Sequence, residues 1–205
     1  MARRSFCLVL ASLLVLPAGA RAVRSRPLQT EPTGAPQPRA HGRRVTVDRA
    51  AVKVDDGDTI SIRWGRRDLE TVRILGVDAP ELRHLDRDIP YAQPFAEESR
   101  AFAQRAFAKA SAVELQRAAT LDQYGRTLAY LFVDGKNYST LVIRARLGQE
   151  TVSRYGDNGF PKEAAEVTAA AREAGPPPFE PPGVFRNRMR EVSRAMKARG
   201  AYPEK

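Results

Sequence analysis

Three stretches with strand character follow one another in the first half of the chain, with no helical pattern between them. Residues 45–54, 59–64 and 69–77 carry β-branched residues in rough alternation, which favours extended strands. The segment Asp55-Asp56-Gly57-Asp58 separates the first two, and residues 65–68 separate the second pair. Asp-Gly pairs are strong turn signals. The sequence therefore predicts a curled meander of three strands.

The remainder of the central region adds strands and helices. Residues 81–93 carry charges and a proline and are expected to form a long mobile loop. A helix is predicted from Pro94, because proline suits a first helical turn. Its predicted core face consists of Phe95, Ser99, Phe102, Ala106 and Phe107. Residues 112–117 and 126–133 have the pattern of two more strands, and residues 138–147 and 161–174 that of two more helices. We expect an α+β fold: a five-stranded barrel of the oligonucleotide/oligosaccharide-binding (OB) type with about three helices.

The 205 residues allow one domain of ordinary size plus tails. We expect a signal peptide at 1–22, a disordered linker rich in Pro and Arg at 23–44, and a folded domain at 45–175. Residues 176–205 are expected to form a proline-rich break and a basic amphipathic helix.

The first residues have the composition of a secretory signal. Arg3 and Arg4 precede an apolar run over residues 6–16, and cleavage could follow Ala20 or Ala22. We therefore expect a secreted protein or one of the periplasm or cell envelope. An uncleaved membrane anchor is the alternative, although a span needs about 20 apolar residues. The only cysteine, Cys7, lies in this segment, so the mature chain has no disulfide.

The charge balance is strongly basic, with a formal net charge of +10. Such an excess attracts polyanions, which makes a nucleic-acid partner plausible. In the C-terminal tail the apolar residues Phe185, Met189, Val192 and Met196 recur at helical spacing, with Arg186, Arg190, Arg194 and Lys197 on other faces. Two interpretations of this helix remain open: packing on the domain, or an arm that binds phosphates or an anionic membrane surface.

Three short clusters carry candidate chemistry: residues 56–59, residues 73–81 and residues 122–126. Each alone has an ordinary structural explanation, since an Asp-Gly-Asp turn is common in hairpins. Arg126 could simply open a strand with its head in solvent, and Glu81 could be a loop acid beside Arg83. His84 is interpreted as an exposed loop residue.

Taken together, the clusters lie at strand ends and turns of one barrel, where carboxylates from separate loops can converge. Carboxylate oxygens suit calcium or magnesium rather than zinc. Phosphodiester hydrolysis needs a cation, a base for the attacking water and positive groups for the charge that develops in the transition state. The three clusters contain those residue types.

From residue 52 to about 174 the chain resembles the staphylococcal-nuclease (thermonuclease) family. The resemblance rests on the three clusters in their order, on Tyr91 before the Pro94 helix, and on the stretch YGRTLAYLFVDG that begins at Tyr124. It implies a five-stranded barrel with three helices and a single Ca²⁺ ion. It also implies calcium-dependent cutting of DNA and RNA by an endonuclease that leaves 3′-phosphate ends.

The resemblance also implies roles for individual residues. Asp58 and Asp78 match the carboxylate metal ligands, and the backbone carbonyl of Ala79 matches a third ligand. Glu81 matches the general base, and Arg73 and Arg126 match the pair that grips the reacting phosphate. Asp56 matches a second acidic group near the metal, Tyr124 a phosphate contact, and Tyr155 a tyrosine of the nucleotide pocket. The best-known family member has threonine in place of Ala79, a change that should leave calcium binding possible because a main-chain oxygen supplies the ligand. It has lysine in place of Gln123, so binding of a terminal phosphate is expected to be weaker here.

Two rival interpretations stand beside a monomeric nuclease. Some members of this fold keep the barrel as a noncatalytic nucleic-acid-binding or interaction module, although the full set of catalytic residue types argues against that here. The other rival is a protein that acts at a membrane surface through its anchor and basic tail.

Overall fold

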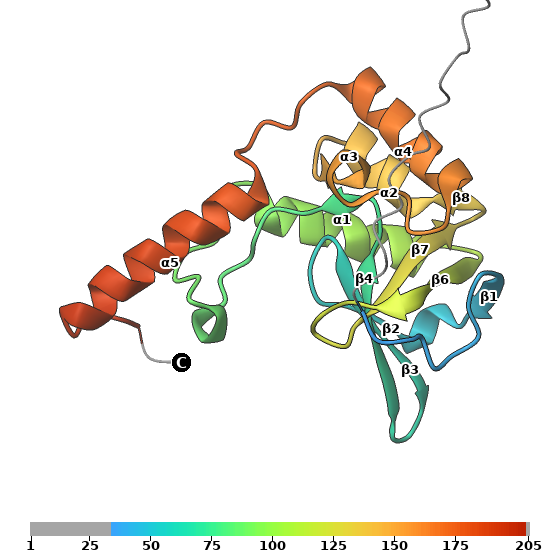
Figure 1. The fold of residues 1–205 in the computed structure, drawn as a ribbon, viewed down its shortest axis with the longest axis horizontal. Coiled ribbons are helices and arrows are strands. Elements are labelled where there is room, and N and C mark those ends of the chain that lie inside the picture. The colour runs from blue at the N-terminus through green and yellow to red at the C-terminus, as the bar shows by residue number, and fades with distance from the viewer. Residues whose placement is uncertain (1–33, 204–205) are drawn as a thin grey trace, which may run out of the picture.

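A computed structural model describes residues 34–203; the expected signal peptide lies outside this range. The elements, in chain order, are β1 (Arg44–Val47), η1 (Arg49–Ala51), β2 (Val52–Val54), β3 (Thr59–Gly65), β4 (Asp68–Ile74), β5 (Val77–Asp78), η2 (Leu85–Arg87), α1 (Ala96–Lys109), β6 (Val113–Leu121), β7 (Thr127–Val133), β8 (Lys136–Asn137), α2 (Tyr138–Arg144), β9 (Gln149–Glu150), α3 (Val152–Tyr155), α4 (Pro161–Ala174) and α5 (Pro182–Ala198). Figure 1 shows their arrangement.

The main sheet curls on itself. Its strand order is β1-β6-β7-β4-β3-β2, so β1 and β2 lie at its two ends. They are nevertheless consecutive in the chain and are interrupted only by η1, whose N-cap Asp48 accepts a hydrogen bond from Ala50 N–H. One half of this broken strand pairs with β6 and the other half with β3. The predicted α+β fold of the OB type is confirmed, with five α-helices between residues 34 and 203 instead of about three.

The core follows from the alternation read in the sequence. Ile60 and Ile62 of β3 and Val72 and Ile74 of β4 are at most 1 % exposed, because every second side chain of each strand faces inward. Strand β7 is buried along nearly its whole length, since it pairs on both sides and α2 packs on it. The helices therefore extend the core beyond the barrel interior.

Part of the expected disordered linker is ordered. Residues 34–43 run beside the second half of β6, where Pro36 bridges to Thr120 and Gln37 N–H donates to the carbonyl of Ala119 at 2.8 Å. The prediction for residues 34–44 was therefore wrong. This segment is held by backbone hydrogen bonds to a strand edge, and such bonds leave no apolar period in the sequence.

A buried ion pair lies under this segment. Arg117 of β6 donates from Nε and a terminal nitrogen to the two carboxylate oxygens of Glu70 on β4, both at 2.7 Å. Thr127 and Trp64 donate to the same carboxylate. Both charged side chains are at most 5 % exposed. The bidentate geometry and added donors supply the hydrogen bonds that a buried ion pair requires.

Helix α5 lies to one side of the barrel, beyond the proline-rich connection that follows α4 (Figure 1). It packs on the segment after β5 through a small apolar cluster of Ile89, Phe185 and Met189, separate from the main core. Tyr202 O–H also donates to the carbonyl of Leu85 at 2.8 Å. The segment expected to be a mobile loop is thus covered by α5. Two residues of the predicted apolar face, Phe185 and Met189, are buried within the protein, and Val192 is partly buried against them.

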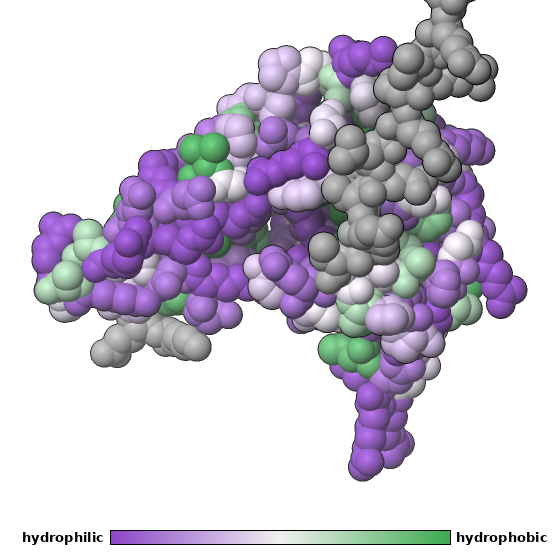
Figure 2. All heavy atoms as spheres, in the orientation of Figure 1, coloured by the Kyte–Doolittle hydropathy of each residue, from purple (hydrophilic) through white to green (hydrophobic). Residues whose placement is uncertain are grey.

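Hydrophilic residues cover the visible side of α5 and the tip of the β3–β4 hairpin (Figure 2). Within residues 34–203, none of the helices combines the length and the apolar character that crossing a membrane requires.

Candidate active site

The Asp-Gly-Asp turn is held tightly against α1. A Cβ added to Gly57 would lie 2.1 Å from Ser99 Oγ and 2.8 Å from Ala79 Cβ, so no larger residue fits without movement. The buried Tyr138 O–H donates to the carbonyl of Gly57 at 2.8 Å. Asp58 N–H donates to Asp56 Oδ1 at 3.0 Å. These contacts determine where Asp58 enters the site.

Asp58 and Asp78 are brought together from separate elements. The N–H of Ala79, directly after β5, donates to Asp58 Oδ2 at 2.6 Å. Arg73, near the end of β4, forms ion pairs with both carboxylates, at 2.8 Å for Asp78. The three side chains are at most 18 % exposed. The structure thus unites three residues that were predicted to form the site.

Negative charge exceeds positive charge around Asp58. Burial raises the pKa of Asp58 to about 7; Arg73 opposes this shift, while the charges of Asp56 and Asp78 reinforce it. Burial would lower the pKa of Arg73, but the surrounding carboxylates raise it, so this arginine stays charged. A further cation near Asp58 would relieve the repulsion among these acids.

Glu81 lies next to this group, but other residues hold its backbone and its carboxylate. Its backbone is held by Gln93: Glu81 N–H donates to Gln93 Oε1 at 3.1 Å, and Gln93 N–H donates to the Glu81 carbonyl at 2.7 Å. Its carboxylate pairs with Arg186 of α5. Burial raises the pKa of Glu81, an effect that Arg186 opposes and the acids Asp58 and Asp78 reinforce.

Arg186 also contacts Asp78, at 3.0 Å and 3.3 Å to its two oxygens. Sequence reasoning placed Arg186 in a basic tail and did not assign it to the site. The separation of 108 residues from Asp78 explains this, because no local spacing signals such a contact. The only signal available was the amphipathic pattern of the tail, which predicts a helix and does not reveal its docking position.

Arg126 stands apart from the acids. Its Nε donates to Asp122 Oδ2 at 2.7 Å within the turn before β7, and its guanidinium lies 5.5 Å from the ring of Tyr124. The structure gives it no contact with the carboxylates of the site. Arg126 directly precedes β7, whose Leu128 lies beside Arg73 of the parallel strand β4.

The remaining predicted residues lie around this centre. Tyr124 is 75 % exposed at its turn, and Tyr155 is 58 % exposed at the end of α3. Helix α3 follows β9, whose Gln149 pairs with Asp78 of β5, and the ring of Tyr155 lies beside Arg154 of the same helix. Asp56 influences Asp58 by its charge and through the turn hydrogen bond, without an ion pair of its own to Arg73.

The donor set can be compared with what a divalent metal needs. Among residues 34–203, no three or more His, Cys, Asp or Glu side chains converge as a complete metal cage. Asp58 and Asp78 nevertheless contact the same guanidinium, that of Arg73, and the Asp58 carboxylate accepts a hydrogen bond from Ala79 N–H. Carboxylate oxygens are hard ligands of the kind that Ca²⁺ and Mg²⁺ accept together with water, so Asp58 and Asp78 are residue types that fit such an ion.

Comparison with known proteins places this arrangement in a family. The family model described as "Staphylococcal nuclease homologue" matches residues 71–175, a segment that includes Arg73, Asp78, Glu81 and Arg126. The chain is 32% identical over 129 residues to the SPbeta prophage-derived endonuclease YokF of Bacillus subtilis (strain 168), covering 60% of this chain and 40% of that protein. It is 33% identical over 107 residues to the endonuclease YncB of the same organism, covering 51% of this chain and 46% of that protein.

The chain thus spans less than half the length of these two relatives. The family match itself covers about half of the 205 residues and ends just after α4. With the predicted clusters assembled on an OB-type barrel, the chain belongs to the staphylococcal nuclease homologue family.

Proposed function

We propose that the protein is a calcium-dependent nuclease that acts outside the cytoplasm and hydrolyses phosphodiester bonds of DNA and RNA, leaving 3′-phosphate ends. The observation that carries the proposal is the buried convergence of Asp58, Arg73 and Asp78 beside Glu81. The family membership and the two endonuclease relatives support it.

Each residue has a defined chemical task. Asp58, Asp78 and the Ala79 carbonyl would hold Ca²⁺, which supplies positive charge to a nonbridging phosphate oxygen when bound. Glu81, whose pKa is raised by burial, accepts the proton of the attacking water. Arg73 provides preorganised positive charge where the phosphorane develops negative charge.

Arg126 is proposed to bind the other side of the phosphate. Its contact with Asp122 uses Nε, so this pair leaves both terminal nitrogens for a ligand. The ion pair also restricts the side chain, which reduces the entropy lost on binding. Tyr124 lies on the same turn and offers an exposed ring and hydroxyl to the substrate.

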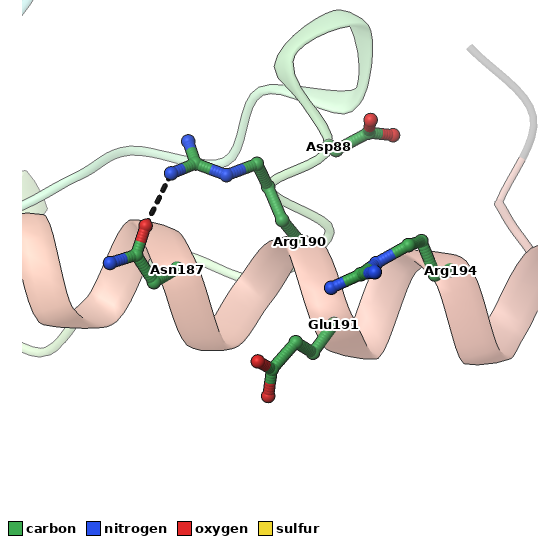
Figure 3. Close-up of a pocket in the computed structure, with 5 residues that line it drawn as sticks. All are labelled: Asp88, Asn187, Arg190, Glu191 and Arg194. Carbon is green, nitrogen blue, oxygen red and sulfur yellow. Dashed lines mark hydrogen bonds between the residues drawn. The ribbon is translucent and has the colours of Figure 1, made fainter.

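The nucleic-acid chain is proposed to continue along α5. Arg190 and Arg194 are four residues apart and therefore lie on one face of the helix, about 6 Å apart along its axis. Figure 3 shows Arg190 and Arg194 beside Asp88, with which they line an open groove of about 440 Å³ together with Asn187 and Glu191. Phosphates would bind the arginines as screened surface charges, so this contribution weakens with salt.

A noncatalytic binding module is the second candidate, and one observation favours it. Both oxygens of Asp78 already accept hydrogen bonds from arginines. A barrel in which the arginines alone neutralise Asp78 would bind nucleic acid without a metal.

One assay separates the two functions. The purified full chain is incubated with plasmid DNA, single-stranded DNA and RNA in the presence of Ca²⁺, Mg²⁺ or a chelator, and the ends are analysed by phosphatase sensitivity. Cleavage with calcium that chelator abolishes is expected. Retarded but intact substrate in every lane would contradict the nuclease and support the binding module.

A further inference from the structure

Arg186 is the residue that connects α5 to the centre of the site. One terminal nitrogen lies 3.0 Å from Asp78 Oδ2, and the other lies 3.3 Å from Asp78 Oδ1 and contacts Glu81 Oε1. Burial would lower its pKa, but the two carboxylates raise it, so its charge persists. Arg186 therefore holds two acids of the site through one rigid, planar group.

The carboxylate of Glu81 depends on this contact. Within residues 34–203, Arg186 is the side chain recorded as donating a hydrogen bond to the Glu81 carboxylate, whereas Gln93 holds the backbone. Burial leaves Glu81 little water to orient it, since its side chain is 14 % exposed. Without a guanidinium beside it, the carboxylate would be repelled by the charges of Asp58 and Asp78.

The ion pairs form a continuous row. Asp58 pairs with Arg73, Arg73 with Asp78, Asp78 with Arg186, and Arg186 with Glu81. Each internal member has an opposite charge on both sides. The row links the carboxylates of Asp78 and Glu81 through the guanidinium of Arg186.

Helix α5 is anchored on both sides of Arg186. Phe185 and Met189 are buried against Ile89, on the segment that follows Glu81. Before the helix, Gln93 donates from Nε2 to the carbonyl of Glu180 at 2.7 Å, and the same Gln93 holds the backbone of Glu81. The helix and the carboxylate thus share one anchor, which determines the position of Arg186 relative to Glu81.

We propose that Arg186 is a positioning residue of the active site, which orients the Glu81 carboxylate relative to Asp78, so that α5 completes the catalytic centre. The inference rests on the proposed nuclease function. It concerns a helix that begins after the matched family segment ends at residue 175. Asp78 can keep this partner while binding a metal, because a carboxylate has about four lone-pair sites.

The test compares turnover and substrate affinity of Arg186→Ala with those of the wild-type chain on one oligonucleotide at saturating calcium. Misplacement of the base is expected to lower kcat on the order of 10²-fold, the loss that a shift of about 1 Å can cause. KM should change by less than about threefold, because Arg186 is occupied by acids and not by substrate. Arg186→Lys keeps the charge without the planar fork and should give an intermediate kcat.

Two controls separate positioning from docking. Arg188→Ala removes an arginine two positions along α5 that pairs with Glu180 instead of with the site, and kcat should stay unchanged. Lys197→Ala breaks the contact with Asp88 at the far end of the helix. It reports the effect of looser docking, and its kcat should fall much less than that of Arg186→Ala. Thermal melts confirm that each variant is folded.

A second readout does not depend on cleavage. Calcium titration by calorimetry should show equal or tighter binding to Arg186→Ala, because a positive neighbour of Asp78 is removed. Loss of turnover together with retained calcium binding supports positioning.

Four results would overturn the inference. Unchanged kcat in Arg186→Ala would show that Glu81 needs no such partner, and raised kcat would show that α5 restrains the site. Equal losses in Arg186→Ala and Lys197→Ala would show that docking alone matters. A wild-type chain that binds but never cleaves contradicts the proposed function and, with it, a positioning role.

Discussion

The carboxylate of Asp58 accepts a hydrogen bond of 2.6 Å from the backbone N–H of Ala79. This bond joins the turn before β3 to the segment after β5, two parts of the chain that each carry one proposed metal ligand. It brings Asp58 next to the residue that follows Asp78, so the two carboxylates lie together. The relationship between these residues underlies the predictions for Asp78 and Gly57.

Replacing a proposed ligand should weaken metal binding more than it affects the fold. Asp78→Ala is expected to lower calcium affinity at least tenfold and to abolish most turnover, because one of two carboxylate ligands is lost. Calorimetric titration and cleavage rate check this, with a thermal melt beside them. Asp86→Ala, in η2, is the matched surface control. Calcium affinity and metal dependence that survive in Asp78→Ala would refute the assignment.

Removing the proton acceptor should affect chemistry more than binding. Glu81→Gln keeps the size of the side chain and is expected to lower kcat by roughly 10²–10⁴-fold, the usual contribution of a positioned general base. Affinity for a noncleavable oligonucleotide should change far less. The double variant with Arg73→Ala should lose less than the product of the single effects, because both groups act on one transition state. An active Glu81→Gln enzyme would reject this base while leaving the nuclease function intact.

The space around Gly57 yields a prediction for a small substitution. Gly57→Ala places a methyl group against Ser99 and Ala79 and should destabilise the protein by about 1–3 kcal/mol, as overpacking does. It should also displace Asp58 and lower turnover. In the control Gly65→Ala, the new Cβ would meet only Asp68 Cβ, at 3.9 Å. Urea unfolding measures the stability of both variants, and equal stabilities would contradict the close approach at Gly57.

The buried pair of Glu70 and Arg117 predicts how stability depends on pH. Burial by itself would raise the pKa of Glu70, but hydrogen bonds from Arg117, Thr127 and Trp64 lower it below its ordinary value. A lowered folded-state pKa stabilises the fold above the ordinary pKa of about 4.3, and this stability is lost as pH falls through the folded value.

Glu70→Gln should therefore cost about 3–5 kcal/mol at neutral pH, since it leaves Arg117 buried without its charge partner. The cost should shrink below pH 4. The control Glu114→Gln breaks a surface pair with Arg44 and should cost at most about 1 kcal/mol. Denaturant unfolding between pH 3 and pH 8 measures the cost of both substitutions. A cost for Glu70→Gln that is the same at every pH would show that protonation of Glu70 does not change the stability.

The arginines farther along α5 should affect salt dependence and leave the chemical step unchanged. If Arg190 and Arg194 contact phosphates, each change to Ala should reduce the slope of log KM against log salt by about 1 with little effect on kcat. Arg66→Ala, at the β3–β4 hairpin, is the control for total charge. If wild type and variants give the same salt curves, Arg190 and Arg194 do not bind phosphates, and Arg186 alone connects α5 to the function of the site.

Much of the fold could be predicted because its signals are local. The alternation of Ile60 and Ile62 with polar residues in β3 has the period of a half-buried strand, and the structure buries those two residues. Helix α4 begins and ends at the predicted residues, with Pro161 in its first turn and Gly175 after its end. The residue types at 58, 73, 78 and 81 indicated one site, and the structure brings these residues together.

Other features were decided by tertiary contacts. Residues 34–43 carry no periodic signal and are ordered by an unpaired edge of β6, which exists only once the barrel has formed. Arg126 is predicted to act together with Arg73, and only the structure shows that it is paired with Asp122 at the turn before β7.

By itself, the sequence determined the strands, the helices and the residue types of the site, because these depend on neighbours within a few positions. It also predicted the amphipathic helix α5. Only the tertiary structure decided that this helix docks on Ile89 and directs Arg186 to Asp78 and Glu81. The physical reason is that an ion pair across more than 100 residues depends on the relative placement of two packed elements. That placement results from the sum of many contacts and is not encoded in any short stretch of sequence.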